Sequence, residues 1–246
     1  MADHVRFIGS GDAFGSGGRF QTCILVEAAG LRWLIDCGAS SMIAIRAQGI
    51  DPNSIDAIVL THLHGDHAGG VPFFLVDAML VSKRQKPLVV AGPPGSRAGM
   101  DRMMEVLFPG SAVMKPRFAY EYVEMEVGRA NAVGALSVTP YAAVHTPETT
   151  PTIVRTEGGG RIVTYTGDSD WTEDLVPATA GADLFVSECY FHDKPVKMHM
   201  NYARLKPELA RLTCKRVVLT HMSPEMIAKS GELPETCAHD GLVVSL

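Results

Sequence analysis

The sequence predicts an α/β protein of four layers, in which two β-sheets pack face to face and helices cover their outer surfaces. Short apolar runs that read as buried strands recur along the chain, separated by segments of helical length. The chain also carries a weak internal echo: residues 32–38 resemble residues 161–168, and residues 57–62 resemble residues 216–221. Each half would therefore supply one sheet with its helices. Because no linker separates the halves, we expect one domain over residues 1–246.

The first half predicts five strands and three helices. The expected strands cover residues 5–8, 22–27, 32–36, 57–60 and 88–91. The expected helices cover residues 42–48, 71–84 and 97–108, with Ser96 as a candidate N-cap for the third. Residues 9–18 are rich in glycine but lack the spacing of a dinucleotide loop, and no helix pattern follows them. We expect this loop to fold toward the functional edge of the sheet, where Asp12 could support a site.

The second half predicts a further series of strands with one helix. Residues 118–126 and 136–143 read as strands, and residues 152–156 and 161–166 read as a hairpin around Gly158-Gly159-Gly160. Strands are also expected at 184–187, 216–219 and 242–246, and residues 207–212 belong to a helix. Several of these strands end directly before a histidine or a carboxylate.

Composition excludes several classes of protein. The chain has 246 residues and a net charge of −5, and no long basic run indicates a broad nucleic-acid surface. Its five cysteines form no CxxC pair, which favours free thiols in a reducing cytoplasm. No secretory signal and no apolar run of membrane-spanning length is apparent. We therefore expect a cytoplasmic protein without a membrane partner.

The most informative stretch is residues 56–70, in which an apolar strand ends at Thr61 and four potential metal ligands follow at once. These are His62, His64, Asp66 and His67. Neutral imidazoles with one carboxylate suit zinc or another first-row metal. Gly65 permits a tight turn between the ligands, and Gly69 and Gly70 permit close approach of other segments. A short loop cannot place all four ligands on one ion, but it can divide them between two.

This stretch resembles the His-x-His-x-Asp-His signature of the metallo-β-lactamase fold superfamily. The resemblance extends over nearly the whole chain and implies an αβ/βα sandwich, mostly found in hydrolases. In that superfamily an Asp at position 36 supports the metal loop. Three later residues that follow apolar strands, His145, Asp168 and His221, have the order that the superfamily uses.

The resemblance implies a dinuclear site. One ion would take His62, His64 and His145, and the other Asp66, His67 and His221, with Asp168 bridging the two. Two Zn²⁺ ions are the default, with Mn²⁺ or Fe as alternatives. A hydroxide shared between the ions would be the nucleophile, and Asp66 would orient it.

A narrower resemblance concerns residues 187–190 and 199–203, together with the opening residues 7–13. They are similar to the tRNase Z family and its arylsulfatase and phosphodiesterase relatives. In that branch a Glu and a His assist phosphoester cleavage, and these roles fall on Glu188 and His199. The family's long tRNA-binding arm does not fit within residues 146–167. We therefore expect a phosphodiesterase-like hydrolase of small ester substrates, including sulfate or carboxylic esters, with nucleic acid not expected as a partner.

Two alternatives remain at the level of sequence. One is a glyoxalase II-like thioesterase or a lactonase, which would share the ligand set. The other is a metal-dependent protein that binds a metabolite without turning it over. Relatives often form homodimers, and the apolar stretch Val71 to Leu80 could supply part of such an interface.

Overall fold

The computed structural model describes residues 2–246, and two seven-stranded sheets form its centre. The first sheet has the order β14-β1-β2-β3-β4-β5-β6 and the second the order β13-β12-β11-β10-β9-β8-β7. The strands of the first are β14 (Val243–Ser245), β1 (His4–Gly9), β2 (Cys23–Ala28), β3 (Leu31–Ile35), β4 (Ala57–Val59), β5 (Leu88–Gly92) and β6 (Tyr120–Glu124). Those of the second are β13 (Thr236–Cys237), β12 (Val217–Thr220), β11 (Leu184–Glu188), β10 (Arg161–Tyr165), β9 (Thr152–Gly158), β8 (Leu136–Ala142) and β7 (Asn131–Val133).

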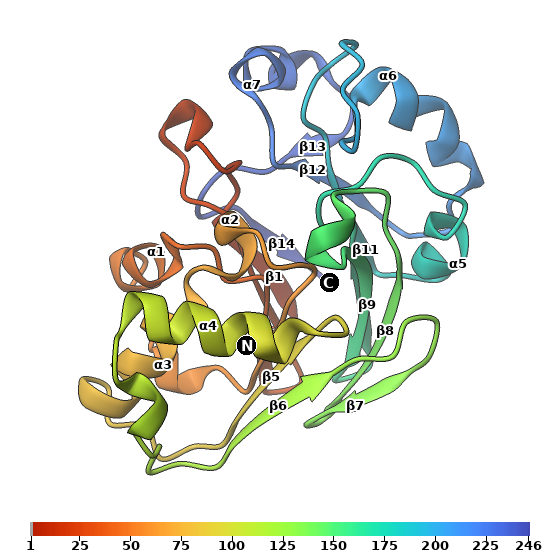
Figure 1. Ribbon diagram of the computed structural model, residues 1–246. Helices are drawn as coiled ribbons and strands as arrows, with labels where there is room; N and C mark the ends of the chain where they lie inside the picture. Colours follow the sequence, from red (N-terminus) through yellow and green to blue (C-terminus); the bar gives the residue numbers. More distant parts are fainter. Residues whose placement is uncertain (1) are drawn as a thin grey trace.

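Helices cover the outer face of each sheet, which gives the four predicted layers (Figure 1). The first sheet carries α1 (Ser41–Ala47), α3 (Val71–Leu80) and α4 (Ser96–Leu107). The second carries α5 (Leu175–Thr179), α6 (Tyr202–Leu205) and α7 (Pro224–Lys229). Among the residues described, no helix combines the length and the apolar character needed to cross a membrane.

The core has three apolar layers, one between the two sheets and one between each sheet and its helices. In β2, Ile24 and Val26 join the core between the sheets, whereas Cys23 and Leu25 face the helices. Successive strand residues point to opposite faces, so a run that is apolar throughout is buried on both. The two sheets also meet through a hydrogen bond, because the indole Nε1 of Trp33 donates to Thr156 Oγ1 at 3.2 Å.

Strand direction brings the polar strand ends to one edge. In the second sheet β10, β11 and β12 are parallel. Strand β8 runs the same way as β10, since each is antiparallel to β9. The residues that follow β8, β10, β11 and β12 therefore leave the sheet at the same edge, near the short helix α2 (Gly65–Ala68) that follows β4 (Figure 1).

The structure differs from the sequence prediction in the partner of the last strand. We expected each half of the chain to supply its own sheet, but β14 pairs antiparallel with β1, with Val5 opposite Val244. The first sheet therefore includes the C-terminal segment. The strand expected at 118–126 in the second half is likewise β6 of the first sheet, where it pairs with β5. The similar sequence segments do form strands in both sheets, β3 and β4 in the first and β10 and β12 in the second. This similarity says nothing about β14, which lies outside the similar segments.

Two helix predictions also need correction. The helix expected over 71–84 ends at Leu80, and Arg84 beyond it is buried with its guanidinium donating to the carbonyls of Pro52, Ile55, Lys86 and Pro87. Ser96 is the first residue of α4 rather than its cap, and its hydroxyl instead accepts a hydrogen bond from Tyr122 at 2.8 Å. The helix expected over 207–212 is a 3-10 helix, η5 (Lys206–Arg211).

Candidate metal centre

The ligand loop between β4 and α3 is packed against the turn that follows β3. A Cβ on Gly70 would lie 2.2 Å from the carbonyl oxygen of Gly38, and a Cβ on Gly38 would lie 2.2 Å from the carbonyl oxygen of Asp66. Such distances are below any real contact, so neither position accepts a side chain without a shift of backbone. The glycines at 38 and 70 thus let the two turns interlock, which fixes the backbone that carries Asp66 and His67.

Asp36 orients His67 from beneath. Its carboxylate accepts hydrogen bonds from the amide and the hydroxyl of Thr61, both at 2.8 Å, and its Oδ2 lies 2.7 Å from His67 Nδ1. Because a carboxylate only accepts, His67 Nδ1 carries a proton, and Nε2 is the nitrogen that faces the cluster. This arrangement agrees with the supporting role that the sequence suggested for Asp36.

The first group of candidate ligands contains three histidines. His64 Nδ1 lies 3.1 Å from His62 Nε2 and 3.2 Å from His145 Nε2. Asp168 Oδ2 lies 4.0 Å from His62 Nε2 and 3.9 Å from His145 Nε2. His145 is held from behind, because its Nδ1 donates to the carbonyl of Met198 at 2.9 Å. His62 Nε2, His64 Nδ1 and His145 Nε2 therefore lie close enough together to share one ion.

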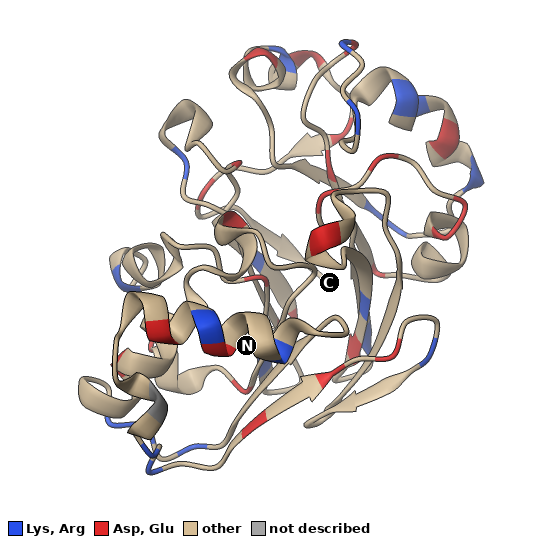
Figure 2. Cartoon of the chain, viewed as in Figure 1, with Lys and Arg blue, Asp and Glu red and all other residues tan. Residues whose placement is uncertain are grey.

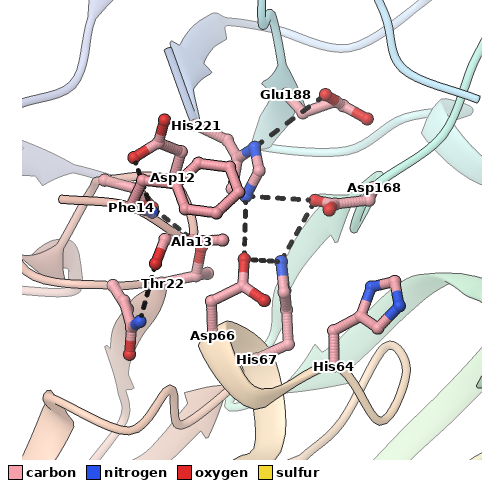
Figure 3. A network of polar contacts seen from close by, with 12 residues as sticks. Asp12, Ala13, Phe14, Thr22, His64, Asp66, His67, Asp168, Glu188 and His221 are labelled. Carbon is pink, nitrogen blue, oxygen red and sulfur yellow. Dashed lines mark hydrogen bonds and ion pairs between the residues drawn. The ribbon is translucent and has the colours of Figure 1, made fainter. Parts of the chain in front are cut away.

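The second group of candidate ligands shares Asp168 with the first. Asp66 Oδ2 lies 3.2 Å from Nε2 of both His67 and His221. Asp168 Oδ1 lies 3.1 Å from His67 Nε2 and 3.4 Å from His221 Nε2. Figure 3 shows these four side chains converging, with Asp168 on the side of the second sheet and Asp66 and His67 on α2. The two oxygens of Asp168 thus face different groups.

These residues fit the two metal ions that the sequence predicts. His67 Nε2 and Asp168 Oδ1 are buried and make no hydrogen bond of good geometry, although they lie 3.1 Å apart. Buried polar atoms without partners are rare in folded proteins, and a shared cation would satisfy both. Within each group the ligand atoms lie within 4.8 Å of one another. The imidazole and carboxylate donors are those that zinc prefers.

The electrostatics of the cluster favour the protonation state of a metal ligand at His62 and at Asp66. At His67 and His221 burial alone would lower the pKa, but Asp168 and Asp66 outweigh it and raise the pKa of both imidazoles. Burial, with the neighbouring histidines, lowers the pKa of His62 well below its ordinary value, so this imidazole is neutral. Burial alone would raise the pKa of Asp66, but His67 and His221 outweigh it and hold the pKa of this carboxyl below its usual range. A neutral imidazole and an ionised carboxylate are the forms that bind a cation.

Glu188 and His199 form a pair next to the second group. His199 Nδ1 lies 3.1 Å from Glu188 Oε2, and Glu188 Oε1 accepts a hydrogen bond from the amide of Ser169. Glu188 is fully buried, and burial followed by the nearby Asp168 raises its pKa well above the ordinary value. His199 is partly exposed and packs between the rings of His145 and Tyr190, at centroid distances of 4.9 and 5.3 Å.

One pocket of about 390 Å³ joins these groups. Its lining is Asp12, Ala13, Phe14, His64, Gly65, Asp66, His145, Thr146, Asp168, Tyr190, His199 and His221, with no Lys or Arg among these described residues. Figure 2 agrees, since Lys and Arg are spread over outer helices, strand ends and loops and do not form one stripe. The volume is in the range that holds a small organic molecule.

The structure brings together all the predicted site residues, while the role of each remains a prediction. Asp12 lines the pocket, as expected for the glycine-rich loop, but its carboxylate serves the loop, accepting from the amides of Phe14 and Ser16. The sequence predicted that the loop of residues 9–18, which contains Phe14, folds toward the site, but it did not single out Phe14, Thr146 or Tyr190 as lining residues. Tyr190 lies two residues after Glu188, so its position near the site could have been expected, but no pattern marks a lone aromatic residue in a loop as part of a site.

Comparisons with known proteins agree with this geometry. Ribonuclease Z of Methanothermobacter thermautotrophicus is 26% identical, covering 89% of this chain and 86% of its own. Ribonuclease Z of Enterococcus faecalis is 26% identical, covering 92% and 88%. Among solved structures, the metallo-β-lactamase fold protein YhfI of Bacillus subtilis has a TM-score of 0.80 at 19% identity, covering 100% of both chains. The short form of human tRNase Z has a TM-score of 0.79 at 24% identity, covering 98% of both.

Fold and site together define a metallo-β-lactamase fold hydrolase of the tRNase Z-like branch, and the relatives support an ester hydrolase of the phosphodiesterase-like kind. Within that class, the family profile described as "Anti-Pycsar protein Apyc1" matches residues 4–236. The chain therefore belongs to the Apyc1 family.

Proposed function

We propose that this protein is a metal-dependent phosphodiesterase that acts on small ester substrates. The observation that carries the proposal is the pair of Glu188 and His199, 3.1 Å apart, beside a cluster of seven candidate ligands, five of which line one pocket together with His199. Two relatives are named ribonuclease Z, and a ribonuclease cleaves phosphodiester bonds. Their name supports a phosphodiester as the bond that this protein cleaves.

We assign the ligands as the sequence suggests. His62, His64 and His145 would hold one ion and Asp66, His67 and His221 the other, with Asp168 between them. Two Zn²⁺ ions, or Mn²⁺ or Fe, would withdraw charge from the ester and lower the pKa of water at neutral pH. The number and identity of the ions are part of the proposal.

The chain's own residues would orient water and donate a proton. Asp66 can accept a hydrogen bond from the attacking water and so direct its lone pair at phosphorus. His199 has Nδ1 bonded to Glu188, so Nε2 is the nitrogen left to protonate the departing oxygen. Buried Glu188 keeps the imidazole in this orientation through its contact with Nδ1.

A small substrate fits the pocket better than a long nucleic acid. The pocket of about 390 Å³ has no Lys or Arg in its described lining. Nucleic-acid affinity depends on neutralising many phosphates with such side chains. Residues 146–167, where tRNase Z enzymes carry their arm, contain η4 (Pro147–Thr149), β9 and β10.

The test is a comparison of rates on protein loaded with two equivalents of Zn²⁺ or Mn²⁺. The substrates are bis-p-nitrophenyl phosphate, p-nitrophenyl sulfate, a thioester and a precursor tRNA. We expect phosphodiester turnover, no turnover by Asp66→Ala, and unchanged turnover by His239→Ala, which removes an exposed histidine outside the pocket. Preference for the thioester, or for the tRNA, would replace the proposal with that activity.

The acid role of His199 has its own signature. A proton donor matters most when the leaving oxygen is a poor leaving group. We therefore expect His199→Ala to lower kcat by about 10²-fold or more for a phenyl leaving group, and less for p-nitrophenyl. An equal loss for both leaving groups would remove the acid role and leave His199 as a binding residue.

We also propose that the protein forms a homodimer through α3 and α4. Phe73, Leu80 and Val81 are 40%, 58% and 68% exposed, and Val106 on α4 is 77% exposed. Large exposed apolar side chains on two neighbouring helices are typical of an interaction site. Light scattering after size exclusion should give twice the chain mass for the wild type and less for Val81→Asp, whereas Ile43→Asp on α1 should leave the mass unchanged. The cytoplasmic location expected from the sequence remains a prediction.

A further inference from the structure

Met198 adopts a backbone conformation that few residues other than glycine tolerate. Its φ is 68°, in the left-handed region, where the Cβ of an L-residue crowds the backbone. The side chain of Met198 is 40% exposed, so packing of this side chain in the core does not explain the strain. Strained residues persist where the surrounding structure holds them, and they cluster at functional sites. Met198 directly precedes His199, the proposed proton donor.

The backbone carbonyl of Met198 holds one of the candidate ligands. It accepts a hydrogen bond from His145 Nδ1 at 2.9 Å, and Nε2 of the same ring lies 3.2 Å from His64 Nδ1. A histidine that binds a metal ion usually donates its other ring N–H to a carbonyl or a carboxylate, which fixes the ring. Residue 198 therefore sets the orientation of His145 through its backbone, and this contact does not depend on its side chain.

The chain is fixed again two residues later. Met200 is 1% exposed, and its carbonyl accepts a hydrogen bond from the Tyr190 amide at 2.8 Å. Between these two anchors, His199 Nδ1 lies 3.1 Å from Glu188 Oε2. The positive φ of Met198 is the turn that lets two consecutive residues reach different partners, because the carbonyl of one contacts the ligand histidine and the imidazole of the next contacts Glu188.

We propose that Met198 is a positioning residue, whose single backbone conformation orients both the metal ligand His145 and the proton donor His199. The part that concerns His199 rests on the proposed function, whereas the part that concerns His145 depends only on metal binding. If residue 198 leaves the left-handed region, its carbonyl and the imidazole of His199 cannot both keep their partners. A residue that resists this region should therefore weaken one bound ion and proton donation together.

The experiment compares two substitutions at position 198 that differ in backbone preference. Met198→Gly accepts a positive φ without strain, whereas Met198→Val, with its branched Cβ, resists it. Lys83→Val is the matched control, because Lys83 has a φ of 48°, is exposed and is absent from the lining of the pocket. Competition with a chromophoric chelator measures the affinity for each of two zinc ions, and kcat and KM are measured for phenyl and p-nitrophenyl phosphodiesters.

We expect Met198→Val to bind one of the two zinc ions about tenfold more weakly or worse. Its kcat should fall by about tenfold or more for the phenyl ester and less for the p-nitrophenyl ester, with KM nearly unchanged. Met198→Gly and Lys83→Val should keep the zinc affinities and the leaving-group dependence of the wild type, even though Lys83→Val unfolds at a lower urea concentration. If Met198→Val does not fold, Met198→Ala should show the same losses at a smaller size.

Two results would overturn the inference. One is wild-type zinc affinity in the valine variant, or an equal loss of affinity in the glycine variant. The other is a zinc effect without any change in leaving-group dependence, since His199 would then be placed without Met198. If glycine restores the zinc affinity that valine lowers, but not even the wild type cleaves a diester, the orientation of His145 by Met198 is upheld and the proposed function is overturned.

Discussion

At the scale of single residues, the site depends on groups that hold the candidate ligands as well as on the ligands themselves. Asp36 is buried, has a positive φ of 60° and contacts His67 and Thr61 with both oxygens. A non-glycine residue rarely adopts this backbone conformation without a compensating role. Here the compensation is the orientation of His67.

The first prediction concerns this orienting carboxylate. Asp36→Asn removes the charge that keeps the proton on His67 Nδ1, so His67 can turn its protonated nitrogen toward the cluster. We expect metal affinity to fall by about 10- to 100-fold. Competition with a chromophoric chelator measures it, and Asp77→Asn, which breaks a surface ion pair with Arg46, is the matched control. Equal affinity in Asp36→Asn and wild type would show that Asp36 does not act through His67.

A second residue-scale prediction concerns stability in acid. Asp183 is 6% exposed and bonds the Ile162 amide at 2.9 Å and Lys215 Nζ at 2.6 Å. Burial alone would raise its pKa, but Lys215 and the Ile162 amide hold the pKa below its ordinary value of 3.8. A lowered pKa means that the native state resists protonation, so the stabilisation is full above the ordinary pKa and is lost as pH falls below it.

A substitution of Asp183 can measure the stabilisation that is lost in acid. Urea unfolding of metal-free protein should show that Asp183→Asn is less stable than wild type by roughly 1 kcal/mol at pH 6. The difference in stability should shrink as the pH falls through 4 toward 3, because Asp183 becomes protonated in the wild type, whereas the asparagine in the variant carries no charge at any pH. A difference that stays constant with pH would mean that Lys215 and the Ile162 amide do not favour the charged form of Asp183 in the folded protein.

Sequence reasoning was strongest for residues whose chemistry is local. His62, His64, Asp66 and His67 lie within one short loop, and their type and spacing alone indicate a metal. His145, Asp168 and His221 were predicted to join them because each follows a strand, and the structure brings them together. The loop that carries Phe14 was expected near the site, but the exposure of Phe14 could not be predicted, since it depends on the path of the whole loop.

At the scale of elements, the interlocked turns decide whether the ligand loop can form. Gly70 precedes α3 and lies against the carbonyl of Gly38, whereas a Cβ on Gly65 in α2 would meet nothing within 4 Å. The two glycines are close in sequence and differ in surroundings. They therefore offer a matched pair of substitutions.

The third prediction uses this pair. Gly70→Ala should lower the free energy of unfolding by about 1–3 kcal/mol or more, because backbone must move to admit the methyl group. Gly65→Ala should leave it unchanged or raise it by up to about 1 kcal/mol, as alanine favours a helix. Urea unfolding in the presence of chelator measures both without a contribution from metal. Equal effects of the two substitutions would contradict the interlocking described for Gly38 and Gly70.

Elements with a long apolar run were predictable, and short ones were not. The expected strands at 5–8, 22–27, 32–36 and 57–60 correspond to β1 to β4 within two residues. Strands β7 and β13 and helices α5 and α7 have two to six residues and were not expected. So few residues contain too little periodicity to distinguish them from a loop, and the neighbours that stabilise them are distant in sequence.

At the scale of the whole molecule, the C-terminal segment joins the two ends of the chain. Strand β14 pairs with β1, and Leu242, Val244 and Leu246 pack against the core between the sheets. Phe7 N donates to Leu242 O at 2.9 Å, and Leu246 N donates to Asp3 O at 2.9 Å. No local pattern could predict this pairing, since a three-residue strand carries no record of its partner.

The last prediction tests this closure. Removal of residues 242–246 exposes the edge of β1 and the apolar surface that three side chains cover. We expect the free energy of unfolding to fall by about 2–4 kcal/mol, and an unpaired strand edge favours aggregation on heating. Val243→Thr, which alters an outward side chain 45% exposed, should change stability by less than about 0.5 kcal/mol. Urea unfolding and light scattering measure both effects. If the shortened chain is as stable as wild type, β14 does not contribute to stability, and β1 can serve as the edge strand of the first sheet without it.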